Sequence, residues 1–68
     1  MIKNCYDLLH HMQENTTNGV LRFTPDTAKK LNLSDDLLDT YAQQLVDMGY
    51  AKRQLRGIFL TPDGWETH

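Results

Sequence analysis

LSDDLLDTYAQQLVDMGYAKRQLRGIFLTPDGWE, residues 33–66, begins with the pattern of an amphipathic helix. Ser34 is a favourable N-cap residue, and the aspartates that follow it suit the positive end of a helix. Apolar residues then recur at spacings of three and four, as on one helix face: Leu38, Tyr41, Ala42, Leu45 and Met48. Gly49 suits the left-handed position that follows many helices. The pattern predicts a helix that follows Ser34, ends at Gly49 and buries Leu45 at the centre of its apolar stripe.

The pattern then changes to that of a hairpin followed by a helical turn. The runs YAKRQ (50–54) and IFL (58–60) are strand candidates, and LRG (55–57) between them predicts a tight turn that contains Gly57. Thr61, Pro62 and Asp63 combine an N-cap residue, a residue of fixed φ and a negative charge, which together favour a helix start. We expect a short helical turn there that carries Trp65.

Two more helices and one strand are predicted before residue 33. Residues 2–14, IKNCYDLLHHMQE, place six apolar side chains on one helix face: Ile2, Cys5, Tyr6, Leu8, Leu9 and Met12. VLRF (20–23) is a short β-branched and aromatic run, typical of a single edge strand. Thr24 is expected to cap a second helix from Pro25 to about Leu31, because Thr24, Pro25 and Asp26 offer favourable capping chemistry.

Size and composition limit what these elements can form. A chain of 68 residues makes one domain with a small core, and its 40% of apolar residues is too high for a disordered tail. No apolar run approaches the roughly 18 residues of a membrane span, and residues 1–11 lack the features of a signal peptide. The single cysteine, Cys5, fits a reducing compartment. We therefore expect one cytoplasmic domain over residues 1–68, without a membrane partner.

The order helix, strand, helix, helix, strand, strand resembles the winged-helix family of helix-turn-helix domains. The resemblance covers nearly the whole chain. Its most specific parts are the third helix, the Leu-x-x-x-Gly-Tyr exit, the two-stranded wing and the Leu-Thr-Pro-x-Gly closure common among bacterial winged-helix regulators. It implies an α+β fold of three helices with a small antiparallel sheet, made of an edge strand and a two-stranded wing.

The same resemblance implies a small DNA-binding protein that regulates transcription. In such proteins the third helix usually enters the major groove, and the wing contacts phosphates or the minor groove. Here Thr40, Gln43 and Gln44 would read base edges, since glutamine can pair with adenine. Four cations would hold the phosphates of duplex DNA: Arg22, Lys52, Arg53 and Arg56. A homodimer formed through the first helix and Trp65 would double this charge.

The acidic residues of the third helix support a second hypothesis. Residues 34–49 contain no lysine or arginine, whereas DNA-binding elements ordinarily neutralise several phosphates. Four aspartates lie there instead: Asp35, Asp36, Asp39 and Asp47. They fit the stabilisation of a helix N-terminus and a solvated face, and they also fit a winged-helix module that binds a basic protein partner, with Trp65 as an anchor. The net charge of −2 favours this alternative.

The basic residues also allow two interpretations. Arg22, Lys29 and Lys30 join the three cations of the wing in a basic rim if the fold brings them together. They are otherwise ordinary surface charges, which also protect edge strands against aggregation.

Neither a catalytic site nor a metal site is predicted. His10 and His11 are adjacent and project on different sides of the first helix, and Cys5 is not one helical turn from either. A zinc site would need a further ligand, for which His68 at the chain end is a poor candidate. The chain has no glycine-rich phosphate loop and no nucleophile motif. We therefore expect no enzymatic activity and no cofactor.

Overall fold

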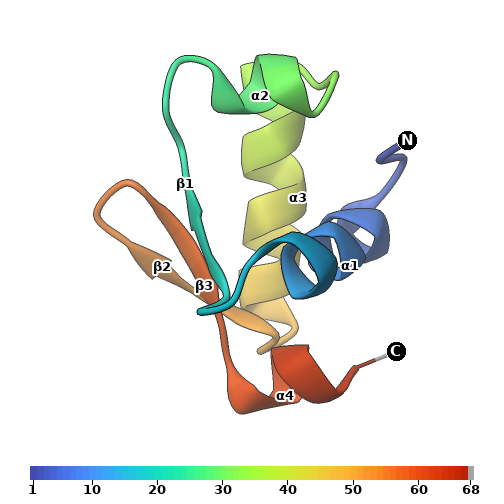
Figure 1. The fold of residues 1–68 in the computed structure, drawn as a ribbon, viewed down its shortest axis with the longest axis vertical. Helices are drawn as coiled ribbons and strands as arrows, with labels where there is room; N and C mark the ends of the chain where they lie inside the picture. Colours follow the sequence, from blue (N-terminus) through green and yellow to red (C-terminus); the bar gives the residue numbers. More distant parts are fainter. Residues whose placement is uncertain (68) are drawn as a thin grey trace.

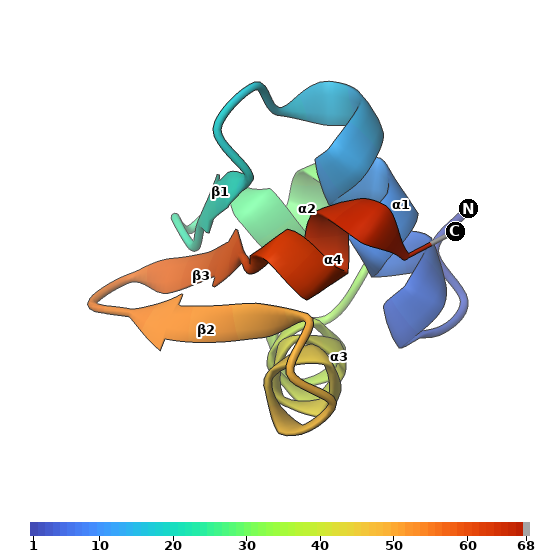
Figure 2. The same ribbon diagram turned by 90° about the horizontal axis from the view of Figure 1, so that it is seen from below.

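The computed structural model describes residues 1–67, in which four helices and three strands form an α+β fold. The elements follow in the order α1 (Cys5–Asn15), β1 (Val20–Arg22), α2 (Thr27–Lys30), α3 (Asp35–Asp47), β2 (Ala51–Gln54), β3 (Gly57–Leu60) and α4 (Pro62–Glu66). The strands lie on one side of the helices, and the β2–β3 hairpin projects away from them (Figure 1, Figure 2). His68, rejected above as a metal ligand, lies outside the described residues.

Helix α3 forms where the sequence pattern predicts it. Ser34 is the N-cap, and its hydroxyl accepts a hydrogen bond of 3.1 Å from the Leu37 amide. Gly49 follows the helix with a φ of 81°, in the left-handed region that favours glycine. Leu45 is fully buried, as predicted, whereas Met48 at the helix end stays 38% exposed.

The antiparallel sheet has β3 at its centre and β1 and β2 at its edges, which confirms a small sheet with β1 as an edge strand. The last pair of the hairpin is Gln54 with Gly57, so that Leu55 and Arg56 alone make the turn. The prediction that Gly57 lies in the turn is therefore wrong. Gly57 begins β3, where a Cβ atom would collide with the carbonyl oxygen of Leu21 on β1.

The core lies between α1, α3 and the inner face of the sheet. Its largest fully buried side chains are Leu8, Leu9, Met12, Leu45 and Ile58. Helix α1 begins at Cys5 because the Asn4 side chain caps it, accepting a hydrogen bond of 2.9 Å from the Asp7 amide. Two residues assigned to the apolar face depart from the prediction: Ile2 precedes the helix, and Tyr6 is 49% exposed.

The two Thr-Pro-Asp sequences have different structures. Thr61 caps α4, and its hydroxyl accepts a hydrogen bond of 3.1 Å from the Gly64 amide. The prediction that Thr24 caps a helix from Pro25 is wrong, because Pro25 and Asp26 form a turn and α2 begins at Thr27. The prediction of three helices is also too low, since the expected last turn is a fourth helix. No helix within residues 1–67 has the length and apolarity needed to cross a membrane.

Candidate nucleic-acid interface

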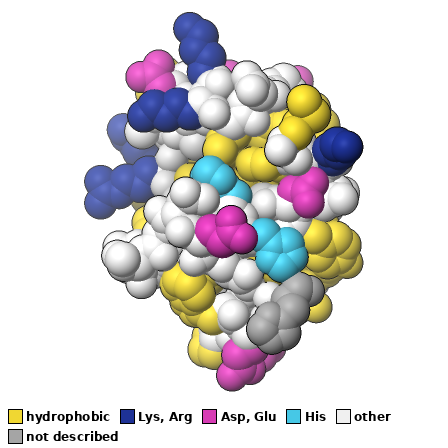
Figure 3. Space-filling model, turned by 45° about the vertical axis from the view of Figure 1, so that its right-hand side comes forward, with side chains coloured by type: hydrophobic (Ala, Val, Ile, Leu, Met, Phe, Trp, Pro, Cys, Tyr) yellow, Lys and Arg dark blue, Asp and Glu magenta, His cyan; other side chains and the backbone are white. Residues whose placement is uncertain are grey.

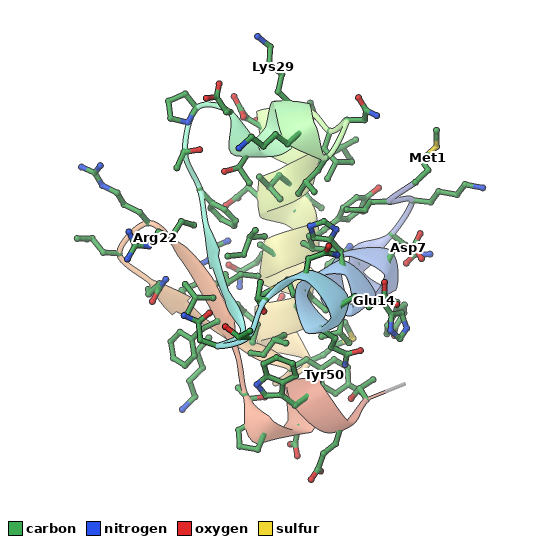
Figure 4. The ribbon with its side chains drawn as sticks, in the orientation of Figure 1. Met1, Asp7, Glu14, Arg22, Lys29 and Tyr50 are labelled. Carbon is green, nitrogen blue, oxygen red and sulfur yellow. The ribbon has the colours of Figure 1, made fainter. Side chains whose placement is uncertain are left out.

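Most of the positive charge lies on β1, α2 and the β2–β3 hairpin. Six of the seven Lys and Arg residues are there, and only Lys3 lies elsewhere. Figure 3 shows most of the visible Lys and Arg side chains at the upper left of one face, with an Asp or Glu side chain among them and another Lys or Arg at the right, while the lower half shows none. In Figure 4, Arg22 points towards the hairpin and Lys29 points outwards from α2, whereas α1 carries Asp7 and Glu14 on the other side. We call Arg22, Lys29, Lys30 and Arg56 the basic end.

Strand alternation separates the cations of the sheet between its two faces. Arg53 lies opposite the buried Ile58, so its side chain belongs to the face that is turned towards α3. Lys52 precedes Arg53 in β2, and Arg22 lies opposite Gly57, which precedes Ile58 in β3. Lys52 and Arg22 therefore belong to the outer face. The four cations assigned to phosphates do not form one group around α3.

Arg53 and Gln43, both predicted DNA contacts, are bonded within the protein. The Arg53 guanidinium forms an ion pair of 3.0 Å with Asp39, and its Nε donates a hydrogen bond of 2.9 Å to Gln43 Oε1. The Gln43 amide in turn donates to Asp47 Oδ1 at 2.8 Å. This series of side-chain bonds joins β2 to three exposed residues of α3: Asp39, Gln43 and Asp47. It neutralises the cation nearest to α3 and occupies one of the predicted base-reading side chains.

The hairpin turn carries a second group of polar side chains around an apolar apex. Arg22, Gln54, Leu55 and Arg56 line a surface hollow of about 400 Å³. The Phe23 amide donates a hydrogen bond of 2.7 Å to the Arg56 carbonyl oxygen, which ties the turn to the chain beyond β1. Leu55 is 97% exposed at the apex. The turn therefore places Leu55 and Arg56 on a supported backbone, with Arg22 at the end of the neighbouring strand β1.

A further hollow lies between the C-terminal half of α1, β1 and α2. It has a volume of about 460 Å³, and its polar lining comes from His11, Asn15, Arg22, Thr24, Thr27 and Lys30. Leu21 and Leu31 supply its apolar lining. Within the described part of the chain, no aspartate or glutamate lines this hollow or the one at the hairpin turn. Arg22 is a lining residue of both hollows, so the two hollows are neighbours on the surface.

The remaining predicted residues lie on α3 and α4. Thr40 and Gln44 are exposed on α3, as are Asp35 and Asp36 at its N-terminus. Trp65 on α4 is 39% exposed, and its ring packs on Gly19, where a Cβ atom would lie 3.0 Å from the nearest ring atom. Part of Trp65 therefore packs inside the chain, and the rest is free to contact a partner.

No group of three or more potential metal ligands converges within residues 1–67. His11 and Asn15 are bonded to one another on α1, since the Asn15 amide donates 2.9 Å to the His11 carbonyl oxygen. Cys5 is buried, and burial raises the pKa of its thiol, so the thiolate is disfavoured.

Leu55 and Lys30 were not among the residues predicted from the sequence to contact DNA. Leu55 was assigned only to the turn, and the lysines of α2 fitted ordinary surface charge. Neither Leu55 nor Arg56 has a positive φ, so this turn does not require glycine or asparagine, and the sequence carries no signal for Leu55.

No protein-family model, curated protein or solved structure matches this chain.

Proposed function

We propose that this protein is a winged-helix DNA-binding domain of the regulator type, which binds duplex DNA through its wing and basic end. The order of its first six elements agrees with the winged-helix pattern, with β2 and β3 as the wing and α2 and α3 as the helix-turn-helix pair. The C-terminal α4 is then an addition that packs against the sheet.

The observation that carries this proposal is that two neighbouring hollows share Arg22 as a lining residue, and that their described lining includes other Lys and Arg residues but no Asp or Glu. Arg56 and Lys30 flank it, one in each hollow. Phosphate binding needs positive charge without competing carboxylates, and the lining of these hollows meets that need. The outer face of α3 carries aspartates instead, which oppose entry into a DNA groove. We therefore place the phosphates of the duplex along the wing and α2, and assign α3 at most a flanking position.

Titration of mixed-sequence duplex DNA at several salt concentrations tests the proposal. Neutralising three to five phosphates predicts a slope of log K against log salt of about −3 to −4.5. The double variant Arg22→Gln, Arg56→Gln removes two of these contacts and is expected to flatten the slope by nearly two. Lys3→Gln is the matched control, because Lys3 is the one cation outside β1, α2 and the hairpin. Absence of binding at low salt, or equal slopes for the double variant and the parent, would overturn the proposal.

The acidic face of α3 supports a second candidate, a module that binds a basic protein partner. Asp35, Asp36, Asp39 and Asp47 are all exposed on this helix. Leu37 on the same helix is 43% exposed and Met48 beyond its end is 38% exposed, which adds apolar contact area. A carboxylate-rich surface with apolar neighbours suits a lysine- and arginine-rich partner segment. The variant Asp39→Asn distinguishes this candidate from DNA binding.

A further inference from the structure

Helix α3 carries a row of largely apolar residues between its core side and its aspartates. The row follows one line of the helix at spacings of four, three and four residues, and we call it the α3 stripe: Leu37, Tyr41, Gln44 and Met48. Leu37 and Met48, at its two ends, are among the large apolar side chains that the fold leaves exposed. They lie about 16 Å apart along the helix axis, at the usual rise per residue. The stripe is therefore long enough to contact several turns of another helix.

The start of α1 widens this apolar surface at the Met48 end. Helices α1 and α3 pack against each other (Figure 1). The hydroxyl of the half-exposed Tyr6 lies 3.5 Å from the Met48 sulfur, and the Tyr41 hydroxyl donates a hydrogen bond of 3.0 Å to the Lys3 carbonyl oxygen. Between the two helices lies a hollow of about 450 Å³, lined by Asn4, Cys5, Tyr6, Gln44, Asp47 and Met48. The hollow has room for an apolar side chain of a partner.

Carboxylates border the stripe on the side away from the core. Asp36 lies beside its first residue and Asp47 beside its last, and both are exposed. Within residues 1–67 the one ion pair joins Arg53 to Asp39, which lies farther round the helix. Asp36 and Asp47 therefore keep their negative charge without a cation beside them. A surface of this kind is complementary to apolar side chains that have cations next to them.

We propose that the α3 stripe is a docking site for an amphipathic helix of another protein, with apolar residues at spacings of three and four and with lysine or arginine beside them. Helices of this type bind by laying their apolar side chains in a groove. One such side chain enters the hollow between Tyr6 and Met48, and the flanking cations meet Asp36 and Asp47. The inference gives the second candidate function a location and a partner, and it does not rest on DNA binding.

A second copy of this chain does not supply such a helix. Among the helices of the described residues only α2 carries lysine or arginine, and with four residues it is too short to reach both ends of the stripe. Packing of one stripe on another would bring Asp36 and Asp47 of both copies together, and like charges across an interface disfavour the contact. The occupant is therefore a different, basic protein.

Fluorescence anisotropy of a labelled leucine–lysine peptide of roughly 18 residues, with its leucines at helical spacing, tests the inference. The parent is expected to bind this peptide at least tenfold more tightly than a peptide of the same composition with the leucines scrambled. The double variant Leu37→Ala, Met48→Ala is expected to weaken binding on the order of tenfold, through lost apolar burial. The double variant Asp36→Asn, Asp47→Asn is expected to weaken binding and to reduce its dependence on salt.

Leu55→Ala and Glu14→Gln are the matched controls, because both residues are exposed and neither belongs to the stripe or lines its hollow. Each is expected to leave the affinity for the peptide within about twofold of the parent, since an isolated surface contact contributes little. Thermal melting of every variant shows whether its fold is intact.

The outcomes separate this inference from both candidate functions. Equal binding of the scrambled peptide, or unchanged affinity of the Leu37→Ala, Met48→Ala variant, refutes the docking site and leaves a general attraction of the acidic face for cations. No binding of either peptide at low salt refutes the docking site together with the basic-partner candidate. The duplex titration is decided separately, because the double variant Arg22→Gln, Arg56→Gln is expected to bind the helical peptide at least as tightly as the parent. Loss of peptide binding in that variant would also overturn the inference, since it would place the peptide at the basic end.

Discussion

At the scale of single residues, Gly57 and Gly49 are required for different physical reasons. Gly57 lies in the central strand, and a Cβ atom there would collide with the backbone carbonyl oxygen of Leu21. Gly49 has a φ of 81°, but a Cβ atom there would meet nothing within 4 Å. A side chain at Gly57 therefore pushes two strands apart, whereas one at Gly49 incurs only the cost of a left-handed backbone.

We predict that Gly57→Ala destabilises the protein more than Gly49→Ala. The Gly49 variant should lose about 1 to 2 kcal/mol of unfolding free energy, the cost of the left-handed conformation for a residue with a Cβ. The Gly57 variant should lose more than this, because backbone cannot move aside as a flexible side chain can. Urea denaturation of the two variants measures the difference. The reverse ranking would show that β1 does not pair closely with β3 at Leu21.

The two Thr-Pro-Asp sequences show what residue patterns can and cannot predict. Both have favourable capping chemistry, yet only Thr61 acts as an N-cap. The difference lies in the residue three positions after each threonine. Gly64 has no side chain and donates its amide to the Thr61 hydroxyl. Thr27 instead has a hydroxyl that accepts from the Thr24 amide at 2.9 Å and donates to the Arg22 carbonyl oxygen at 2.7 Å. The Thr27 hydroxyl therefore competes with a cap by Thr24. Its bond to the Arg22 carbonyl oxygen depends on the position of β1, which the Thr-Pro-Asp pattern does not include.

At the scale of elements, the contact between β2 and α3 determines which candidate residues are free. The periodicities predict both elements. In the structure, alternation along β2 places Lys52 and Arg53 on opposite faces of the sheet. The sequence could not show that α3 lies under the face of Arg53, because this depends on how the sheet packs on the helices. The bonds of Arg53 to Asp39 and Gln43 therefore could not be predicted, although Arg53 and Gln43 are both residues that the sequence assigns to DNA contact.

Asp39→Asn distinguishes the two candidate functions. Exposed ion pairs contribute about 0 to 1 kcal/mol, so unfolding free energy should change little. The change removes a carboxylate and releases Arg53, so duplex DNA should bind a few-fold more tightly, with a steeper dependence on salt. Parallel titrations of duplex DNA and of a lysine-rich peptide with parent and variant measure this. Weaker duplex binding would contradict wing-led DNA binding, and peptide binding that depends on Asp39 in the absence of duplex binding would favour the protein-partner candidate.

At the scale of the whole molecule, the distribution of charge matters more than its sum. The net charge of −2 disfavours DNA binding when it is considered alone. The cations are nevertheless concentrated on β1, α2 and the hairpin, while four of the nine acidic residues lie on α3. Such a separation orients the molecule as it approaches a polyanion, with the basic end foremost. The α+β class and most of the elements could be predicted from the sequence, but this separation of charge could not, since it depends on which strand ends meet.

Amide chemical-shift mapping of the isotopically labelled protein with a short duplex, at low salt, shows which surface meets DNA. If the wing and the basic end bind the phosphates, the largest shift changes fall at Arg22, Lys30, Leu55 and Arg56. The outer face of α3, at Thr40 and Gln44, should change little, because its aspartates keep it away from the phosphates. The largest changes on Thr40, Gln43 and Gln44, with small ones at the hairpin turn, would contradict the account and place α3 in the groove.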